Sequence, residues 1–179
     1  MCQIELYIPK KEDLWYRQKM MEDPKTMDYN KGYFLESSNY DNETGCILFP
    51  EEDWEDWYAY FINQEPKRYY AYILRKGDHT FLGDVCLRKI NDKNEYEMGI
   101  VIESIHRSKG YSKVALKLLL EIAFEKLHAQ AVLNSFEETR TAALHLHLST
   151  GFTILSKKEN IIHLIFTKEQ YFKQNKSML

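Results

Sequence analysis

The sequence predicts a single domain of the α/β (α+β) class, spanning residues 1–179 and built on one mixed, mostly antiparallel sheet. Its 179 residues and hydrophobic content of 44% suit one domain with a continuous core. Three adjacent segments rich in aromatic and branched residues, separated by polar turns, are typical of an antiparallel meander. A strand, helix, strand pattern follows them and indicates some parallel pairing. We expect about seven strands and about four helices.

The first part of the chain is expected to hold two helices separated by a long loop. A short alternating strand covers residues 3–8, and a helix over about residues 11–21 ends at Pro24. Residues 23–50 show no clean periodicity, so we expect a long loop, which in a compact domain is usually functional. A proline followed by three carboxylates favours a second helix over about residues 50–63, because carboxylates in a first turn interact well with the helix dipole.

The remaining part is expected to alternate strands with helices. The three strands of the meander cover residues 69–75, 80–90 and 96–102. Residues 111–127 form an amphipathic helix, because apolar residues gather on one side and charged residues recur every four positions on the other. The later elements are a strand over 131–136, a short helix over 138–149 closed by Gly151, and strands over 152–155 and 161–166.

Charge and cysteine content exclude several classes of protein. The chain has 24 Lys and Arg against 27 Asp and Glu, and this net charge of −3 provides no general attraction to nucleic acid or anionic membrane. Three cysteines about 40 residues apart form neither a disulfide framework nor a metal knuckle. The first residues include a glutamate where a signal peptide is apolar, and no later run is long enough to span a membrane. We therefore expect a cytoplasmic protein that binds no metal, nucleic acid or membrane.

Residues 22–65 form an acidic and aromatic segment. They hold twelve acidic side chains against Lys25 and Lys31, a net charge of −10, so the rest of the chain carries +7. The segment also contains ten aromatic residues. One interpretation is a solvated surface over core-packing rings; the other is a pocket in which carboxylates and ring faces bind a cation. The candidate substrate-binding residues in the segment are Tyr29, Tyr33 and Trp54.

The loop between the last meander strand and the amphipathic helix is a candidate phosphate site. Gly110 lies where the loop enters the helix, and Arg107 and Lys109 add two cations. A helix N-terminus presents unpaired N–H groups and a partial positive charge, and a glycine there lets a phosphate approach closely. Neither the Walker pattern nor the dinucleotide pattern occurs in the chain. The alternative is an ordinary strand-to-helix connection.

The pattern Arg107-x-x-Gly110-x-Ser112 is followed about 40 residues later by a short helix that ends in Gly151-Phe152. This combination resembles the GCN5-related N-acetyltransferase (GNAT) superfamily. The resemblance covers about residues 4–166 and is clearest over residues 81–152. It implies a V-shaped cofactor cleft between two central parallel strands and an acetyl-CoA-binding core over residues 96–152.

The resemblance also implies which residues bind the co-substrate. Backbone N–H groups of Ile100 and Ile102 would pair with the pantetheine arm and hold the thioester oxygen. The pyrophosphate would lie on the loop formed by Arg107, Ser108, Lys109, Gly110, Tyr111 and Ser112. Arg140 and His147 would face it from the later helix. The chain departs from the family in having Ser112 in place of Gly or Ala, and Arg140 and His147 in place of Asn and Tyr.

Two residues are candidates for proton transfer. Glu97 occupies a strand position where relatives often place a carboxylate base; the alternative is a solvated or ion-paired glutamate. His147 stands where the family often has a tyrosine proposed to protonate the leaving thiolate, and a histidine near its ordinary pKa of about 6.5 can donate such a proton. The alternative for His147 is a structural role. Asn134 and Phe136 are expected either to line the cleft and contact substrate or to pack in the sheet, and an acyl-cysteine intermediate is not expected.

The sequence therefore predicts an acetyl-CoA-dependent N-acetyltransferase that acts on a primary amine by direct attack. The acidic segment favours a cationic acceptor, such as a polyamine, an aminoglycoside or a peptide N-terminus. The alternative is an acyl-CoA-binding sensor that uses the same cleft without turnover. A nucleic-acid-binding module is disfavoured because basic and aromatic residues do not interleave on one element. The oligomeric state stays open, and a homodimer is compatible with the sequence.

Overall fold

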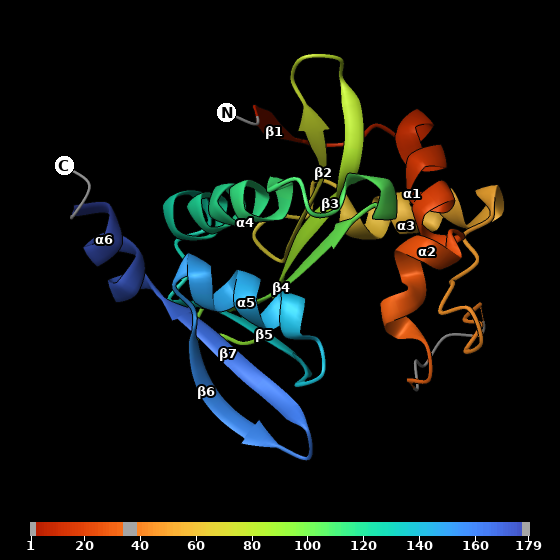
Figure 1. The fold of residues 1–179 in the computed structure, drawn as a ribbon. Coiled ribbons are helices and arrows are strands. Elements are labelled where there is room, and N and C mark those ends of the chain that lie inside the picture. The colour runs from red at the N-terminus through yellow and green to blue at the C-terminus, as the bar shows by residue number, and fades with distance from the viewer. Residues whose placement is uncertain (1–2, 34–38, 177–179) are drawn as a thin grey trace.

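The computed structural model describes residues 3–33 and 39–176. Its centre is a seven-stranded sheet with the strand order β1-β2-β3-β4-β5-β7-β6, shown in Figure 1. Every neighbouring pair is antiparallel except β4 and β5, which are parallel. The predicted fold class and strand number are confirmed. The strands are β1 (Ile4–Tyr7), β2 (Arg68–Arg75), β3 (Thr80–Lys89), β4 (Glu95–Ile102), β5 (Ala131–Glu137), β6 (Thr153–Lys158) and β7 (Ile161–Thr167).

The described residues form six α-helices, two more than the sequence predicted. Four of them match the expected helices, although α4 ends in a π-helical turn over Ile122–Lys126. The other two are α2 and α6. The helices are α1 (Leu14–Met21), α2 (Pro24–Met27), α3 (Trp54–Phe61), α4 (Tyr111–Glu121), α5 (Thr141–Thr150) and α6 (Lys168–Lys176).

The two unexpected helices begin at side-chain caps. Asp23 is the N-cap of α2 and accepts hydrogen bonds from the backbone N–H groups of Lys25 and Thr26. Pro24, which was expected only to end α1, is the first residue of α2. The expectation of a structureless loop over residues 23–50 is therefore wrong at its start. Thr167 and Gln170 form a reciprocal capping box at α6, in which each side chain accepts the backbone N–H of the other residue.

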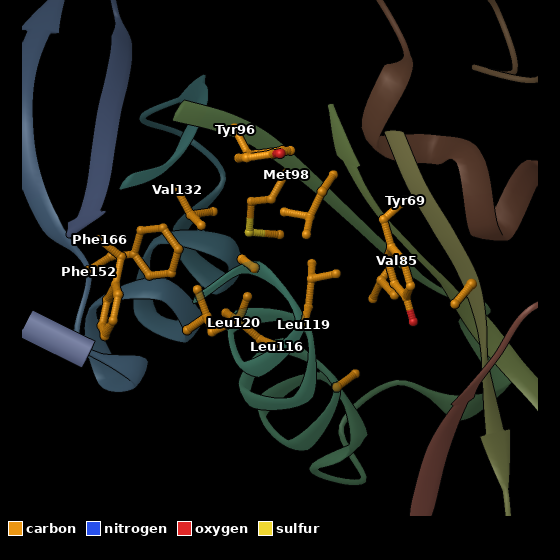
Figure 2. Packing of buried hydrophobic residues seen from close by; sticks show 14 of the residues in the cluster. Tyr69, Val85, Tyr96, Met98, Leu116, Leu119, Leu120, Val132, Phe152 and Phe166 are labelled. Atoms are coloured by element: carbon orange, nitrogen blue, oxygen red, sulfur yellow. The ribbon is translucent and has the colours of Figure 1, made fainter. Parts of the chain in front are cut away.

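The helices cover the two faces of the sheet in two groups. α4 and α5 lie over one face, and α1, α2 and α3 lie on the other side (Figure 1). Figure 2 shows the core under α4, where Leu116 and Leu119 pack toward Val85, Met98 and other apolar residues of the sheet. The opposite face is aromatic, with Tyr16 of α1 against Tyr72 of β2 at a ring separation of 5.2 Å. No helix of the described ranges is long and apolar enough to cross a membrane.

β4 and β5 pair over a short distance and then separate. Residues Glu95, Tyr96 and Glu97 pair with Ala131, Val132 and Leu133, and the pairing ends there. Beyond it β4 stays paired with β3 and β5 stays paired with β7. The backbone edges of β4 and β5 therefore face each other across an opening in the middle of the sheet, which is the predicted V-shaped cleft.

Candidate functional site

The cleft between the separated strands holds a cavity with a volume of about 760 Å³. It is lined by the second half of β4, the loop that follows it, the first turn of α4, the middle of β5 and α5. Tyr29 closes it from the N-terminal part of the chain. A cavity at the carboxyl ends of two diverging strands is a common place for a ligand in a mixed sheet.

The loop before α4 has the backbone of an anion site. Gly110 is the N-cap of α4 with φ +81°, and a Cβ atom there would meet no atom within 4 Å. Ser108 is also left-handed, with φ +60°. The first turn of α4 has neither a capping side chain nor an acidic residue. Its N–H groups and positive dipole end are therefore available to a phosphate, and Ser108, Tyr111 and Ser112 line the cleft beside them.

The β4 edge of the cleft presents backbone donors. Alternate residues of a strand point their N–H groups to opposite neighbours. The N–H of Glu103 donates to the carbonyl oxygen of Leu82 in β3 at 2.9 Å. The N–H groups of Ile100 and Ile102 therefore point the other way, toward the opening where β5 is no longer paired with β4. Both residues line the cleft. This is the orientation that the predicted contact with a pantetheine arm requires.

The two basic side chains of the loop are both hydrogen-bonded to backbone carbonyl oxygens. Arg107 donates to the backbone oxygens of Ile102 at 3.1 Å, Lys25 at 3.2 Å and Thr26 at 2.5 Å. The Lys109 ammonium donates to the carbonyl oxygen of Ile105 at 2.9 Å. Arg107 lines the cleft, and Lys109 does not. The anion-binding capacity of the loop therefore comes mainly from its backbone.

His147 is buried and engaged at both ring nitrogens. Its Nδ1 lies 2.8 Å from the carbonyl oxygen of Ala143, which can only accept, so Nδ1 carries the proton. Its Nε2 lies 3.0 Å from the amide nitrogen of Asn134 and accepts from it. Burial lowers the pKa of His147 below its ordinary value. This geometry favours the structural interpretation, in which His147 fixes α5 against β5 beside Phe136.

The burial of His147 predicts a pH dependence of stability. The pKa of His147 is lower in the folded chain than in the unfolded chain, so below about pH 6.5 the unfolded chain binds a proton here more readily than the folded chain does. The free energy of unfolding therefore falls as pH falls through that value. His106, whose pKa burial also lowers, contributes in the same direction. We expect His147→Gln to lose less stability between pH 7.5 and 5.5 than the wild type in denaturant titrations. The exposed His145, changed to Gln, is the control, and equal pH dependence in both variants would contradict this role.

Glu97 lies outside the cleft lining. Its carboxylate pairs with the Arg88 guanidinium on the adjacent strand β3, and both side chains are exposed. Met98 and Gly99, which follow it on β4, do line the cleft. The ion-paired interpretation of Glu97 is therefore the one that the structure favours, and its role as a base stays a prediction.

The predicted substrate-binding residues fall into three groups. Tyr29, Asn134 and Phe136 line the cleft. Tyr33 does not line the cleft but contacts the cleft residue Arg140, whose guanidinium lies 4.9 Å from the Tyr33 ring and 5.2 Å from the Tyr29 ring. Trp54 is not part of the cleft: its ring packs on Phe49, and its indole N–H donates to the Phe49 carbonyl at 3.3 Å.

The aromatic rings of residues 22–65 bind cations that belong to the chain itself. The Arg17 guanidinium lies 4.4 Å from the Trp57 ring and 5.2 Å from the Phe49 ring. Arg68 lies 3.6 Å from the ring of Tyr60. Of the described residues that line the cleft, none is Asp or Glu. The packing interpretation thus describes these rings better than the cation-pocket interpretation, and Phe34, another ring of the segment, lies outside the described residues.

Several cleft residues were not singled out in the sequence. His106 precedes the phosphate loop, and its position between two predicted site residues was the available signal. Alternation along β4 and helical spacing along α5 were the signals for the others. These further residues are Met98, Gly99, Val101, Ser135, Thr139, Thr141, Ala142, Ala143 and Leu146.

The described residues contain no group of three or more His, Cys, Asp or Glu that could hold a metal ion. Independence from metal stays a prediction.

Cys86 lies beside Gly99, and burial raises the pKa of its thiol to about 12. Such a thiol carries almost no thiolate near neutral pH, which agrees with the expectation of no acyl-cysteine intermediate.

The chain matches the family model of the acetyltransferase (GNAT) domain over residues 4–153. It therefore belongs to the GNAT acetyltransferase family, as the loop and helix motifs predicted. No functionally curated protein matched the chain.

Solved structures share the fold at low sequence identity. A spermidine N-acetyltransferase from Vibrio cholerae in complex with CoA and spermine has a TM-score of 0.76 at 15% identity, covering 95% of this chain and 98% of that one. A GNAT-family acetyltransferase from Bacillus anthracis has a TM-score of 0.71 at 15% identity, covering 93% and 96%. The Vibrio cholerae enzyme in complex with manganese ions gives 0.72 at 16% identity, with 96% of each chain covered.

Proposed function

We propose that this chain is an acetyl-CoA-dependent N-acetyltransferase that acetylates a primary amine by direct attack. The observation that carries the proposal is the cleft itself. An uncapped helix N-terminus at Gly110, with open space beside the glycine, lies in the same cleft as the backbone N–H groups of Ile100 and Ile102. The first suits a pyrophosphate and the second suits an amide-bearing arm. The CoA complex of the Vibrio cholerae structure supports the same assignment.

The reaction needs one bond to form and one to break. The lone pair of the neutral amine nitrogen attacks the thioester carbonyl carbon, a C–N bond forms and the C–S bond breaks. The nitrogen loses one proton and the leaving thiolate takes up one, so the products are an amide and the free thiol of CoA. Acetyl-CoA supplies the activated acetyl group. The contribution of this chain is to hold the thioester against β4 and present the amine to it, and such positioning lowers the barrier by several kcal/mol.

Glu97 can be tested against its own ion-pair partner. We expect Glu97→Gln and Arg88→Gln to change kcat/KM for the amine by the same small factor, because each variant only breaks the exposed ion pair. Steady-state rates from pH 6 to pH 9 provide the measurement. If Glu97→Gln alone falls by about 10²-fold at neutral pH and recovers at high pH, Glu97 is the general base.

The proposed acceptor is a cationic amine, and the proposed location of the protein is cytoplasmic. The spermine complex of the Vibrio cholerae structure supports a cation. The net charge of −10 of residues 22–65 supports long-range attraction of a cation, since none of the described residues that line the cleft is Asp or Glu. Since attraction between exposed charges is screened over about 8 Å at physiological ionic strength, KM for such an amine should rise with salt. A neutral or anionic best substrate would contradict the charge assignment.

A non-catalytic acyl-CoA sensor is the second candidate. The observation that favours it is the state of His147, both of whose nitrogens are occupied within the fold. The two candidates differ in turnover: both predict that CoA raises the Tm, but only the enzyme releases thiol from acetyl-CoA when an amine is added. Thiol release measured over a panel of amines, with product masses, separates them.

A further inference from the structure

Arg107 is hydrogen-bonded to two parts of the chain that are far apart in sequence. Its Nε donates to the carbonyl oxygen of Ile102, at the end of β4. Its two terminal nitrogens donate to the carbonyl oxygens of Lys25 and Thr26 in α2, and Nη1 also lies 3.4 Å from Asp28. One guanidinium thus holds α2 against the strand that carries the cofactor loop.

A second set of contacts connects the same two segments. The N–H of Ser104 donates to the Thr26 hydroxyl at 3.0 Å, and the Ser104 hydroxyl donates to Asp23 at 3.2 Å. Thr26 has no exposed surface. The carboxylate of Asp23 also caps α2, so the cap and the contact with the loop depend on the same residue.

The segment held in this way continues directly into the wall of the cleft. Tyr29 lies one residue beyond Asp28, lines the cleft, and contacts the Arg140 guanidinium on its opposite side. Arg140 is the N-cap of α5. Residues 23–30 therefore span the cleft from the cofactor loop to α5, and Arg107 is their main attachment at the loop end.

We propose that Arg107 is a positioning residue that couples the cofactor loop to the Tyr29 side of the cleft, so that CoA bound at the loop holds residues 23–30 in place. The inference rests on the proposed CoA site. Its physical basis is linkage: a ligand that orders the loop also favours the hydrogen bonds that the loop makes with α2, and an amine that contacts Tyr29 favours the loop in return.

Hydrogen exchange with CoA as the probe tests the proposal without knowledge of the amine. We expect saturating CoA to slow exchange of the backbone amides of residues 23–30 by roughly fivefold or more in the wild type, the lower range of typical coupling between sites. Arg107→Lys keeps the charge but cannot reach three carbonyl oxygens at once, so the protection should be lost. Lys109→Gln removes a cation from the same loop and should keep the protection once CoA is saturating.

The change in Tm with CoA, measured on the same samples, separates the possible failures. If CoA raises the Tm of the wild type but leaves exchange of residues 23–30 unchanged, the coupling is wrong while the CoA site stands. If Arg107→Lys binds CoA and keeps the full protection, Arg107 is not the coupling residue. If CoA does not raise the Tm of the wild type at all, the proposed CoA site is wrong, and the coupling that rests on it is wrong as well.

Discussion

Gly110→Val should abolish the rise in Tm that CoA produces. The glycine has φ +81°, and the space beyond its Cα is empty, so a valine would point two methyl groups into the position proposed for the pyrophosphate. At a CoA concentration of about 100 times Kd, the wild type gains about 2.7 kcal/mol of stability. For a chain of this size that corresponds to a rise in Tm of roughly 5–10 °C. Thermal unfolding with and without CoA measures both values.

Gly32→Val is a matched control for backbone strain. Gly32 has φ +79°, and a Cβ atom there also meets nothing within 4 Å, but it does not line the cleft. Both variants should lose about 1–2 kcal/mol without ligand, the cost of a left-handed non-glycine residue. Only Gly110→Val should lose the effect of CoA. An unchanged CoA effect in Gly110→Val would remove the pyrophosphate from this loop.

Arg17→Met should destabilise the fold by about 3–5 kcal/mol, because it leaves the buried carboxylate of Asp84 without its cation. Arg17 lies 3.3 Å from Asp84, which also accepts a 2.6 Å hydrogen bond from the Tyr70 hydroxyl. Desolvation raises the pKa of Asp84 in spite of the neighbouring guanidinium. Equilibrium unfolding in urea measures the loss, and Asp84→Asn in the Arg17→Met background should recover part of it.

Arg88→Met provides the comparison for that effect. This variant also removes the arginine of an ion pair, here with Glu97, but both side chains of this pair are exposed. Exposed ion pairs contribute at most about 1 kcal/mol, so the two arginine variants should differ by several-fold in lost stability. Equal losses would mean that Asp84 does not depend on its cation in the folded protein.

Much of the fold follows from local sequence patterns. The meander and α4 were predictable because the period of apolar residues changes clearly from two to nearly four between residue 102 and residue 111. α2 was missed because it is only four residues long and its proline also ends α1. α6 was missed because its residues are mostly polar, although Thr167 and Gln170 have the spacing of a capping box.

The candidate site was predictable in its backbone and less so in its side chains. Gly110, Ile100 and Ile102 lie where the motif implied, because a strand, loop and helix N-terminus determine where backbone N–H groups point. The direction of a long side chain depends on contacts that are distant in sequence. Arg107 points to α2 because the carbonyl oxygens of Lys25 and Thr26 accept hydrogen bonds from its guanidinium there. No local pattern in the sequence encodes that contact.

The same limit applies to the acidic and aromatic segment. Its composition left open both a solvated surface over packing rings and a pocket for a cation, and it could not show that Arg17 and Arg68 already lie on its ring faces. Arg17 is 40 residues from Trp57 in sequence, and the sheet brings them together. Intramolecular and ligand cations satisfy an aromatic surface equally well, so only the fold distinguishes them.

Release of CoA thiol from acetyl-CoA, measured with a panel of primary amines and with mass detection of the product, tests the central claim most directly. We expect at least one amine to accelerate thiol release and to gain one acetyl group, and we expect Gly110→Val to lose this activity while Gly32→Val keeps it. If CoA raises the Tm of the wild type and no amine in the panel is acetylated, the cleft binds acyl-CoA without transfer and the assignment as an acetyltransferase is contradicted.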